Sequence, residues 1–256
     1  APAPKPRSEV PGETVGVTVL VTRMQRPVAS LGRETLSLKV DGDASRVVAL
    51  EGPGTAPLSR ALAVDLSSTM TPHLPELGRL LGQMTLQVTS GGGSVSLVVG
   101  ADVARRALDW GIGPEALAEV LRSAGPEPQG DLAGMVTTAL AGLGDRPGRR
   151  LLLVVTDGGD TADRDDWRRA EETAAAAAAP ILVVELPGLE GRPASALDRL
   201  VESCGGERFA APTGELMGTV LRHYGDLLEA TYAVRFQRPG GTRSAPMKVR
   251  ISTAND

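Results

Sequence analysis

One stretch of the chain, residues 151–158, reads LLLVVTDG and does more than any other to decide the fold. Its first five residues form a continuous apolar run that ends in turn residues, which is typical of a strand buried on both faces of a parallel sheet. A second run of this kind, ALAV at residues 61–64, lies upstream and also ends in an aspartate, Asp65. Segments with helical character follow both runs. Strands that alternate with helices predict an α/β fold with a mostly parallel sheet.

The segments around these two runs predict the rest of the α/β unit. Further strands are expected at residues 95–99, 104–110, 181–184 and 207–210. A tight connection joins the first two, so this pair should be antiparallel. Helices are expected at residues 72–87, 114–123, 132–142, 165–179, 194–203 and 213–229, where Pro114 suits a first turn and Thr213 an N-cap. Together these elements predict a doubly wound, mostly parallel six-stranded sheet of Rossmann-like type.

The two ends of the chain show a different pattern, in which apolar and polar residues alternate. This alternation is typical of antiparallel strands that have one face on a core. It occurs at residues 15–21, 36–40, 46–50, 232–236 and 247–251. We therefore expect these strands to pair with one another, although they come from opposite ends of the chain.

The patterns predict a division of the chain into three parts. Residues 13–57 and 230–256 are expected to form one small, discontinuous antiparallel β domain, into which the α/β unit of residues 58–229 is inserted. Residues 1–12, which begin APAPKP, read as an extended linker or tail. Such a start is common after a removed export signal, which favours a periplasmic, cell-surface or secreted protein. No apolar run is long enough to span a bilayer.

Composition excludes several classes of function. The formal net charge is -4, and the densest basic group, Arg146, Arg149 and Arg150, is expected to be a solvated turn before a strand. Nucleic-acid binding, which needs a basic face, is therefore not expected. The single cysteine, Cys204, rules out an intrachain disulfide. The oligomeric state is left open by the sequence.

Polar residues follow the apolar runs where ligands bind in open α/β sheets, outside the carboxyl ends of the strands. The first run continues as DLSST at residues 65–69, and the second as TDGGD at residues 156–160. Alternate residues of an extended loop point the same way, so Asp65, Ser67 and Thr69 should face one point. One carboxylate and two hydroxyls are hard oxygen ligands, which suit Mg²⁺.

These residues resemble a known family. Asp65, Ser67 and Thr69 match the Asp-x-Ser-x-Ser motif of the metal ion-dependent adhesion site (MIDAS) in von Willebrand factor type A (vWA) domains, with threonine in the last position. Asp157 matches the distal aspartate of that family. The order of strands and helices is also similar over roughly residues 58–229. The flanking strands resemble those of a bacterial, often exported, vWA subset.

The resemblance implies a metal-dependent protein-binding module, used for adhesion or scaffolding, rather than an enzyme. Its cofactor would be Mg²⁺, with Mn²⁺ or Ca²⁺ as alternatives, and its partner another protein bound at the metal-site face. The metal ligands it implies are Asp65, Ser67, Thr69, Asp157 and Asp131. The residues expected on the partner-binding rim are Ser68, Gly130, Gly158 and Asp160.

Asp131 departs from the family pattern, which usually has threonine at this second loop. A Gly-Asp pair before an apolar helix is a cap signature, so N-capping is favoured over metal ligation for Asp131. If Asp131 did join Asp65 and Asp157, three carboxylates would surround a dication and leave a net negative site. Such a site would favour a basic or polar partner group over an acidic one.

Two other functions stay open at this point. The first is a structural vWA domain that binds by shape and has lost its dependence on metal. The second is a metal-dependent phosphohydrolase that uses a strand-end aspartate as nucleophile. The haloacid dehalogenase type of this enzyme needs Asp-x-Asp, whereas position 67 here is serine.

Overall fold

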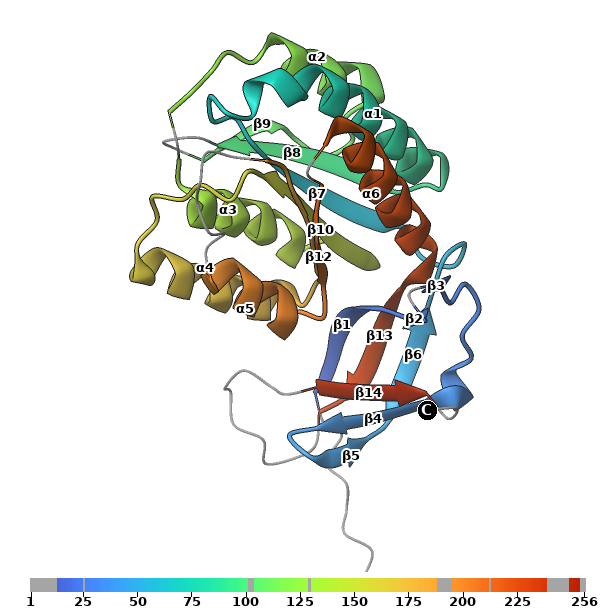
Figure 1. The fold of residues 1–256 in the computed structure, drawn as a ribbon. Helices are drawn as coiled ribbons and strands as arrows, with labels where there is room; N and C mark the ends of the chain where they lie inside the picture. The colour runs from blue at the N-terminus through green and yellow to red at the C-terminus, as the bar shows by residue number, and fades with distance from the viewer. Residues whose placement is uncertain are drawn as a thin grey trace, which may run out of the picture.

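The computed structural model describes residues 13–24, 26–100, 104–128, 130–187, 195–211, 213–238 and 249–253. The linker predicted at residues 1–12 lies outside the described residues, as do the first two residues of the strand predicted at 247–251. Figure 1 shows a larger part, in which helices cover a sheet, and a smaller part built from strands.

The larger part is built on one sheet of six strands. These are β7 (Leu58–Asp65), β8 (Ser94–Gly100), β9 (Arg105–Leu108), β10 (Arg149–Thr156), β11 (Ile181–Glu185) and β12 (Glu207–Ala210). Their order across the sheet is β12-β11-β10-β7-β8-β9. All neighbours are parallel except β9, which runs antiparallel to β8. All eight residues of β7 are buried, as expected for a central strand with both faces covered.

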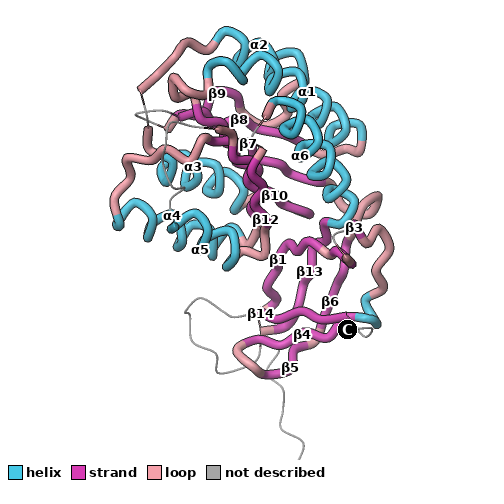
Figure 2. Tube along the Cα trace, in the orientation of Figure 1, coloured by secondary structure: helices cyan, strands magenta, loops and turns pink. Residues whose placement is uncertain are grey.

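Helices cover both faces of this sheet, as Figures 1 and 2 show. One face packs on α1 (Leu74–Ser90), α2 (Pro114–Ser123) and α6 (Gly214–Leu227), and the other on α3 (Leu132–Gly144), α4 (Arg164–Ala177) and α5 (Ser195–Ser203). Successive strand residues point to opposite faces, so Leu62 belongs to the first core and Ala63 to the second. None of the helices in the described residues is long and apolar enough to cross a membrane. The predicted doubly wound sheet is confirmed.

The smaller part consists of antiparallel strands from both ends of the chain. One sheet has the order β1-β13-β6 and the other β14-β4-β5. Their bounds are β1 (Thr14–Leu20), β4 (Leu36–Val40), β5 (Asp43–Ser45), β6 (Val47–Glu51), β13 (Thr231–Gln237) and β14 (Val249–Thr253). Leu38 and Val40 of one sheet share a core with Val234 and Phe236 of the other. The expected pairing between the two ends of the chain is therefore present.

Short elements complete the fold. They are the hairpin of β2 (Thr22–Arg23) and β3 (Arg26–Pro27) and the 3-10 helices η1 (Arg33–Thr35), η2 (Thr71–His73) and η3 (Leu228–Ala230). The hairpin and η1 were not predicted from the sequence, because two or three residues are too few to show an apolar repeat. The helices predicted at residues 72–87 and 213–229 overlap η2 and η3.

The basic group at residues 146–150 is not the solvated turn expected from the sequence. Arg149 is buried, and its guanidinium donates to the carbonyl oxygens of Ala56 and Leu228, both at 3.0 Å. Arg146 stacks over the Trp110 ring, 4.6 Å from its centroid. Residue 56 precedes the larger part and residue 228 follows its last long helix, so Arg149 joins the two connections between the parts. The prediction was wrong because these acceptors are far from residue 149 in the sequence.

Candidate functional site

The candidate site lies where the winding of the sheet reverses. After β7 the chain continues to β8 on one side, whereas after β10 it continues to β11 on the other, and β7 and β10 are direct neighbours. Both strands end at the same edge of the sheet, β7 at Asp65 and β10 at Thr156. Such a switch point is the usual ligand position in an open α/β sheet, because the loops diverge there and leave room.

The loop after β7 is fixed by the Asp65 carboxylate, which is only 5% exposed. Its Oδ1 accepts a hydrogen bond from the backbone N–H of Ser67 at 2.7 Å, and its Oδ2 accepts one from the Thr156 hydroxyl at 3.0 Å. On the opposite side of the loop, the Glu127 backbone N–H donates to the Leu66 carbonyl at 3.2 Å. These bonds hold Ser67 and the residues after it over the end of β10.

Two hydroxyls of this loop meet the carboxylate of Asp157. Ser67 Oγ lies 3.4 Å from Asp157 Oδ2, and Thr69 Oγ1 donates to the same oxygen. The two hydroxyl oxygens are 3.1 Å apart. The structure thus brings together Asp65, Ser67, Thr69 and Asp157, which come from two loops about 90 residues apart in the sequence. All four were selected from the sequence as site residues.

Thr156 belongs to the same cluster, although it was not among the site residues selected from the sequence. Its hydroxyl donates to Asp65 and accepts the backbone N–H of Gly158 at 3.0 Å. Gly158 has a positive φ of 83°, a conformation that favours glycine, and this turn places Asp157 at the tip of the strand. Asp157 Oδ1 in turn accepts the N–H of Gly159 at 2.9 Å. Threonine is common in strands, so nothing in the sequence alone distinguished Thr156.

The two carboxylates of the cluster repel each other in a setting with little water. Burial, together with the nearby charge of Asp157, raises the pKa of Asp65 to about 6. The hydrogen bonds from Ser67 and Thr156 act in the opposite direction and stabilise the charged form. In the described part of the chain, neither carboxylate pairs with an arginine or lysine. As far as the structure describes the chain, the site therefore holds buried carboxylates that no ion pair neutralises.

Asp131 serves as the N-cap of α3. Its Oδ1 accepts the backbone N–H of Gly134 at 2.6 Å, which is the use that the sequence favoured over metal ligation. Among the described residues, no three His, Cys, Asp or Glu side chains lie close enough to hold a metal ion together. A cluster of the three carboxylates Asp65, Asp131 and Asp157 is thus absent from this part of the chain.

Asp160 connects the loop after β10 to the start of α3. Its Oδ1 accepts the backbone N–H groups of Leu132 and Ala162 at 3.2 and 3.0 Å, and its Oδ2 accepts the indole N–H of Trp167 at 2.7 Å. Burial raises the pKa of Asp160, and the charge of Asp131 adds to this effect. Both oxygens of Asp160 are therefore engaged within the protein.

The residues expected on the rim differ in their exposure. Ser68 is exposed, Asp160 is half-buried, and Gly130 and Gly158 are buried. The Gly130 carbonyl accepts the backbone N–H of Thr161 at 3.0 Å, which joins the loop before α3 to the loop after β10. Of these four residues, Ser68 has the side chain that a partner could contact most directly.

The donor set fits a small divalent cation. It consists of oxygen atoms only: the carboxylates of Asp65 and Asp157 and the hydroxyls of Ser67 and Thr69. Mg²⁺ prefers such hard oxygen ligands and typically takes one or two carboxylates while it keeps several waters. A dication would also balance the charges of the two carboxylates, of which that of Asp157 adds to the effect of burial on the pKa of Asp65.

Comparison with known proteins identifies the fold. No known protein family matches the sequence, and no match appears among curated proteins. Solved structures do match, and they define the fold as that of a von Willebrand factor type A domain. A vWA protein from Catenulispora acidiphila superposes with a TM-score of 0.54 at 10% identity, over 95% of this chain and 70% of its own.

Two of the similar structures are pilus proteins. A mutant of the PilB minor pilin from Streptococcus sanguinis has a TM-score of 0.55 at 11% identity, over 68% of this chain. The match spans 62% of the pilin, which is less than two thirds of its length. The vWF domain of the type V pili tip protein Mfa5 from Porphyromonas gingivalis has a TM-score of 0.51 at 10% identity, over 73% of this chain and 98% of that domain. At these identities the likeness establishes the fold alone.

Proposed function

We propose that this chain is a protein-binding module that contacts its partner through a divalent metal ion at the carboxyl ends of β7 and β10. One observation carries the proposal: the hydroxyls of Ser67 and Thr69 converge on a single carboxylate oxygen of Asp157. Hydroxyls and carboxylates from two loops gather there around one point, at the position where this type of sheet binds ligands.

Asp65, Ser67, Thr69 and Asp157 would hold the ion, and Mg²⁺ suits this oxygen set best, with Mn²⁺ or Ca²⁺ as alternatives. When bound, the ion supplies a positive centre with open coordination positions that an oxygen atom of the partner can occupy. Thr156 keeps the Asp65 carboxylate in place, since it donates to Oδ2. Asp131 is left out of this ligand set, because its carboxylate caps α3.

The residue two positions after Asp65 argues against a phosphohydrolase of the haloacid dehalogenase type. That class needs a second aspartate at this position, whereas residue 67 is a serine whose hydroxyl lies 3.4 Å from the Asp157 carboxylate. The site therefore supports binding rather than catalysis, and we propose that the protein is not an enzyme. The negative net charge and the absence of a basic face in the sequence favour a protein partner over nucleic acid.

The similar structures favour a role outside the cell. One is a minor pilin and another is the vWF domain of a pilus tip protein. We infer by analogy that this chain is exported and that it acts in adhesion or scaffolding at or beyond the cell surface.

Metal binding is tested by thermal unfolding of the protein, first stripped with EDTA and then given Mg²⁺ or Mn²⁺. A metal at 100 times its Kd adds about 2.7 kcal/mol to the free energy of unfolding. We expect this gain in the native chain and its loss in Asp157→Asn. Asp165→Asn is the matched control, because Asp165 is an exposed aspartate on the following helix. No metal-dependent shift in the native chain would overturn the metal site.

The binding function is tested separately. The native chain and Asp157→Asn are each immobilised and exposed to surface proteins of the source cell, with Mg²⁺ or with EDTA. We expect a protein that the native chain retains in Mg²⁺ and releases in EDTA, and that Asp157→Asn does not retain. Equal retention under all four conditions would instead favour a structural vWA domain that binds without metal.

A further inference from the structure

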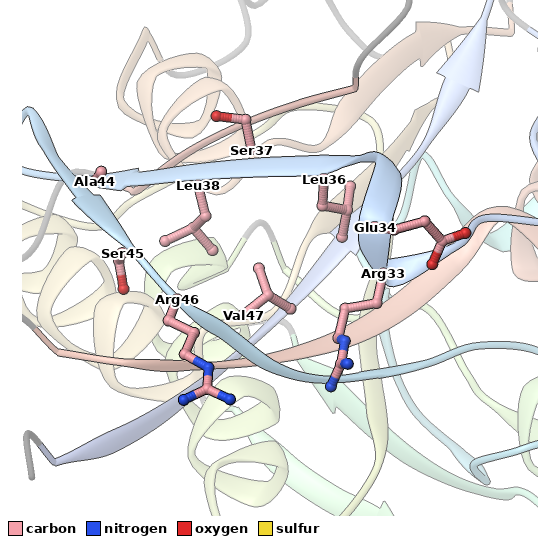
Figure 3. Close-up of a pocket in the computed structure, with 9 residues that line it drawn as sticks. All are labelled: Arg33, Glu34, Leu36, Ser37, Leu38, Ala44, Ser45, Arg46 and Val47. Carbon is pink, nitrogen blue, oxygen red and sulfur yellow. The ribbon is translucent and has the colours of Figure 1, made fainter.

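A hollow lies in the smaller part of the molecule, outside the six-stranded sheet that carries the candidate metal site. It opens between the β4–β5 hairpin, η1 and the start of β6, and its volume is about 400 Å³ (Figure 3). Pockets that take small ligands range from about 300 to 1,000 Å³, so this hollow lies near the lower end of that range. Figure 1 places this hairpin at the end of the molecule away from the six-stranded sheet.

The floor of the hollow is apolar. Leu36 and Leu38 of β4 and Val47 of β6 line it, and in Figure 3 their side chains point into the space between the two strands. Leu38 is 3% exposed and belongs to the core of the small sheets, whereas Leu36 and Val47 are half-buried. An aliphatic group placed here would extend this core and remove apolar surface from water.

Two guanidinium groups lie beside this floor. In Figure 3 the side chains of Arg33 and Arg46 extend to the same side of the hollow, whereas the Glu34 carboxylate points away from it. Arg33 is held in place, since its Nη1 donates to the Val48 carbonyl at 3.1 Å. Arg46 is exposed, and within the described residues its side chain has no hydrogen bond or ion pair. The mouth of the hollow therefore offers positive charge to an anion.

We propose that this hollow binds the C-terminal residue of a partner protein when that residue is leucine, isoleucine or valine. Such a residue carries a carboxylate and an aliphatic side chain on the same Cα atom, so both fit within one small hollow. An internal acidic residue fits less well, because the next side chain of an extended peptide points to the opposite face. Arg46 and Arg33 would bind the carboxylate by charge-assisted hydrogen bonds, and Leu36, Leu38 and Val47 would contact the side chain.

The test uses two fluorescein-labelled hexapeptides, Gly-Ser-Gly-Ser-Val-Leu with a free carboxylate and the same peptide with a C-terminal amide. Fluorescence polarisation measures the Kd of each for the whole chain. We expect the free acid to bind at least about tenfold more tightly than the amide, as suits a charged hydrogen bond. Arg46→Met should weaken binding of the acid by about tenfold and leave the amide unchanged. This variant removes the charge and keeps an apolar stem.

Controls separate this site from other effects. Arg26→Met removes an exposed arginine from the β2–β3 hairpin and should leave both Kd values unchanged. A third peptide, amidated and with an internal aspartate, should bind no better than the plain amide. EDTA and Asp157→Asn should have no effect, so the result does not depend on the metal site. Equal binding of acid and amide, equal binding by Arg46→Met and the native chain, or no binding of the acid would each overturn the proposal.

Discussion

The hydroxyl of Thr156 and the carboxylate of Asp65 are joined by a hydrogen bond of 3.0 Å, although the two residues are 91 positions apart in the sequence. Each ends a central strand of the sheet, and β7 and β10 are neighbours. The bond therefore aligns the two loops that carry Ser67, Thr69 and Asp157. Much of the geometry of the candidate site depends on a residue that would not itself touch a metal ion.

Replacement of Thr156 by valine should test this role, because valine keeps the shape and removes the hydroxyl. The change leaves one oxygen of Asp65 and the N–H of Gly158 without partners, so we expect the free energy of unfolding to fall by about 1–3 kcal/mol. Urea unfolding measures the fall. Thr219→Val on the exposed face of α6 is the control and should change stability by less than about 0.5 kcal/mol.

The raised pKa of Asp65 predicts how stability depends on pH in EDTA. The folded chain holds this proton up to about pH 6, whereas an unfolded aspartate releases it near 3.8. The stabilising effect of protonation is therefore fully present below about pH 4 and is lost as the pH rises to about 6. The loss amounts to as much as about 3 kcal/mol, at 1.36 kcal/mol for each pKa unit.

Asp65→Asn should remove this dependence. Urea unfolding at pH 4, 5, 6 and 7 should show the variant gaining stability relative to the native chain as the pH rises. A difference between the two proteins that is the same at pH 4 and pH 7 would mean that Asp65 titrates as an ordinary aspartate.

Two substitutions of Asp131 distinguish capping from metal binding. Serine is a good N-cap but has no carboxylate, so Asp131→Ser should change stability little and leave Mg²⁺ affinity as it is. Asp131→Ala loses the bond to Gly134 and should cost about 1 kcal/mol. Calorimetric titration with Mg²⁺ measures the affinity of both variants. A Kd that rises at least about tenfold in Asp131→Ser would show that this carboxylate is a ligand.

Two buried arginines should respond in opposite ways to replacement by methionine. Arg149 donates to the carbonyls of Ala56, Leu228 and Thr231, so Arg149→Met leaves buried acceptors without partners and should cost about 2–4 kcal/mol. Arg60 is fully buried, and its Nη2 donates to the Thr85 hydroxyl at 3.3 Å. Burial lowers the pKa of Arg60 to about 9.

In the described part of the chain, Nε and Nη1 of Arg60 have no hydrogen-bond partner. A buried charge without a partner opposes folding, so Arg60→Met should leave the free energy of unfolding unchanged or raise it. Chemical denaturation of both variants provides the comparison. A loss of stability in Arg60→Met as large as that in Arg149→Met would refute the distinction.

The α/β unit is predictable from sequence because its strands are buried on both faces. Such strands appear as uninterrupted apolar runs, and the run at residues 151–155 lies within β10, which extends from Arg149 to Thr156. The strands at the chain ends also show their alternation. Their contacts with the larger part could not be predicted in this way. Thr18 of β1 is buried there: its N–H donates to the Ala178 carbonyl, and its hydroxyl accepts the backbone N–H of Arg150. No local sequence pattern predicts contacts between the two parts of the molecule.

The candidate site, too, could be predicted where local sequence patterns mark its residues and not where long-range contacts define them. Asp65 and Asp157 are recognisable because they end apolar runs, and the motif spacing selects Ser67 and Thr69. Thr156 is missed because threonine is common in strands, so its hydroxyl carries no signal until the partner strand is known. Asp160 looks like a rim residue in sequence, yet three donors from two segments engage its oxygens. Long-range partners decide such roles.

Strand β10 would have a mechanical consequence if the chain holds a partner as proposed. Thr156 lies at one end of this strand. Arg149 lies at the other end and donates to Ala56 and Leu228, which belong to the two chain connections to the small sheets. Seven residue steps in an extended strand cover about 23 Å. A pulling force applied to the loop after β10 would thus be transmitted along this buried strand directly to the small sheets, and the surface helices would bear little of it.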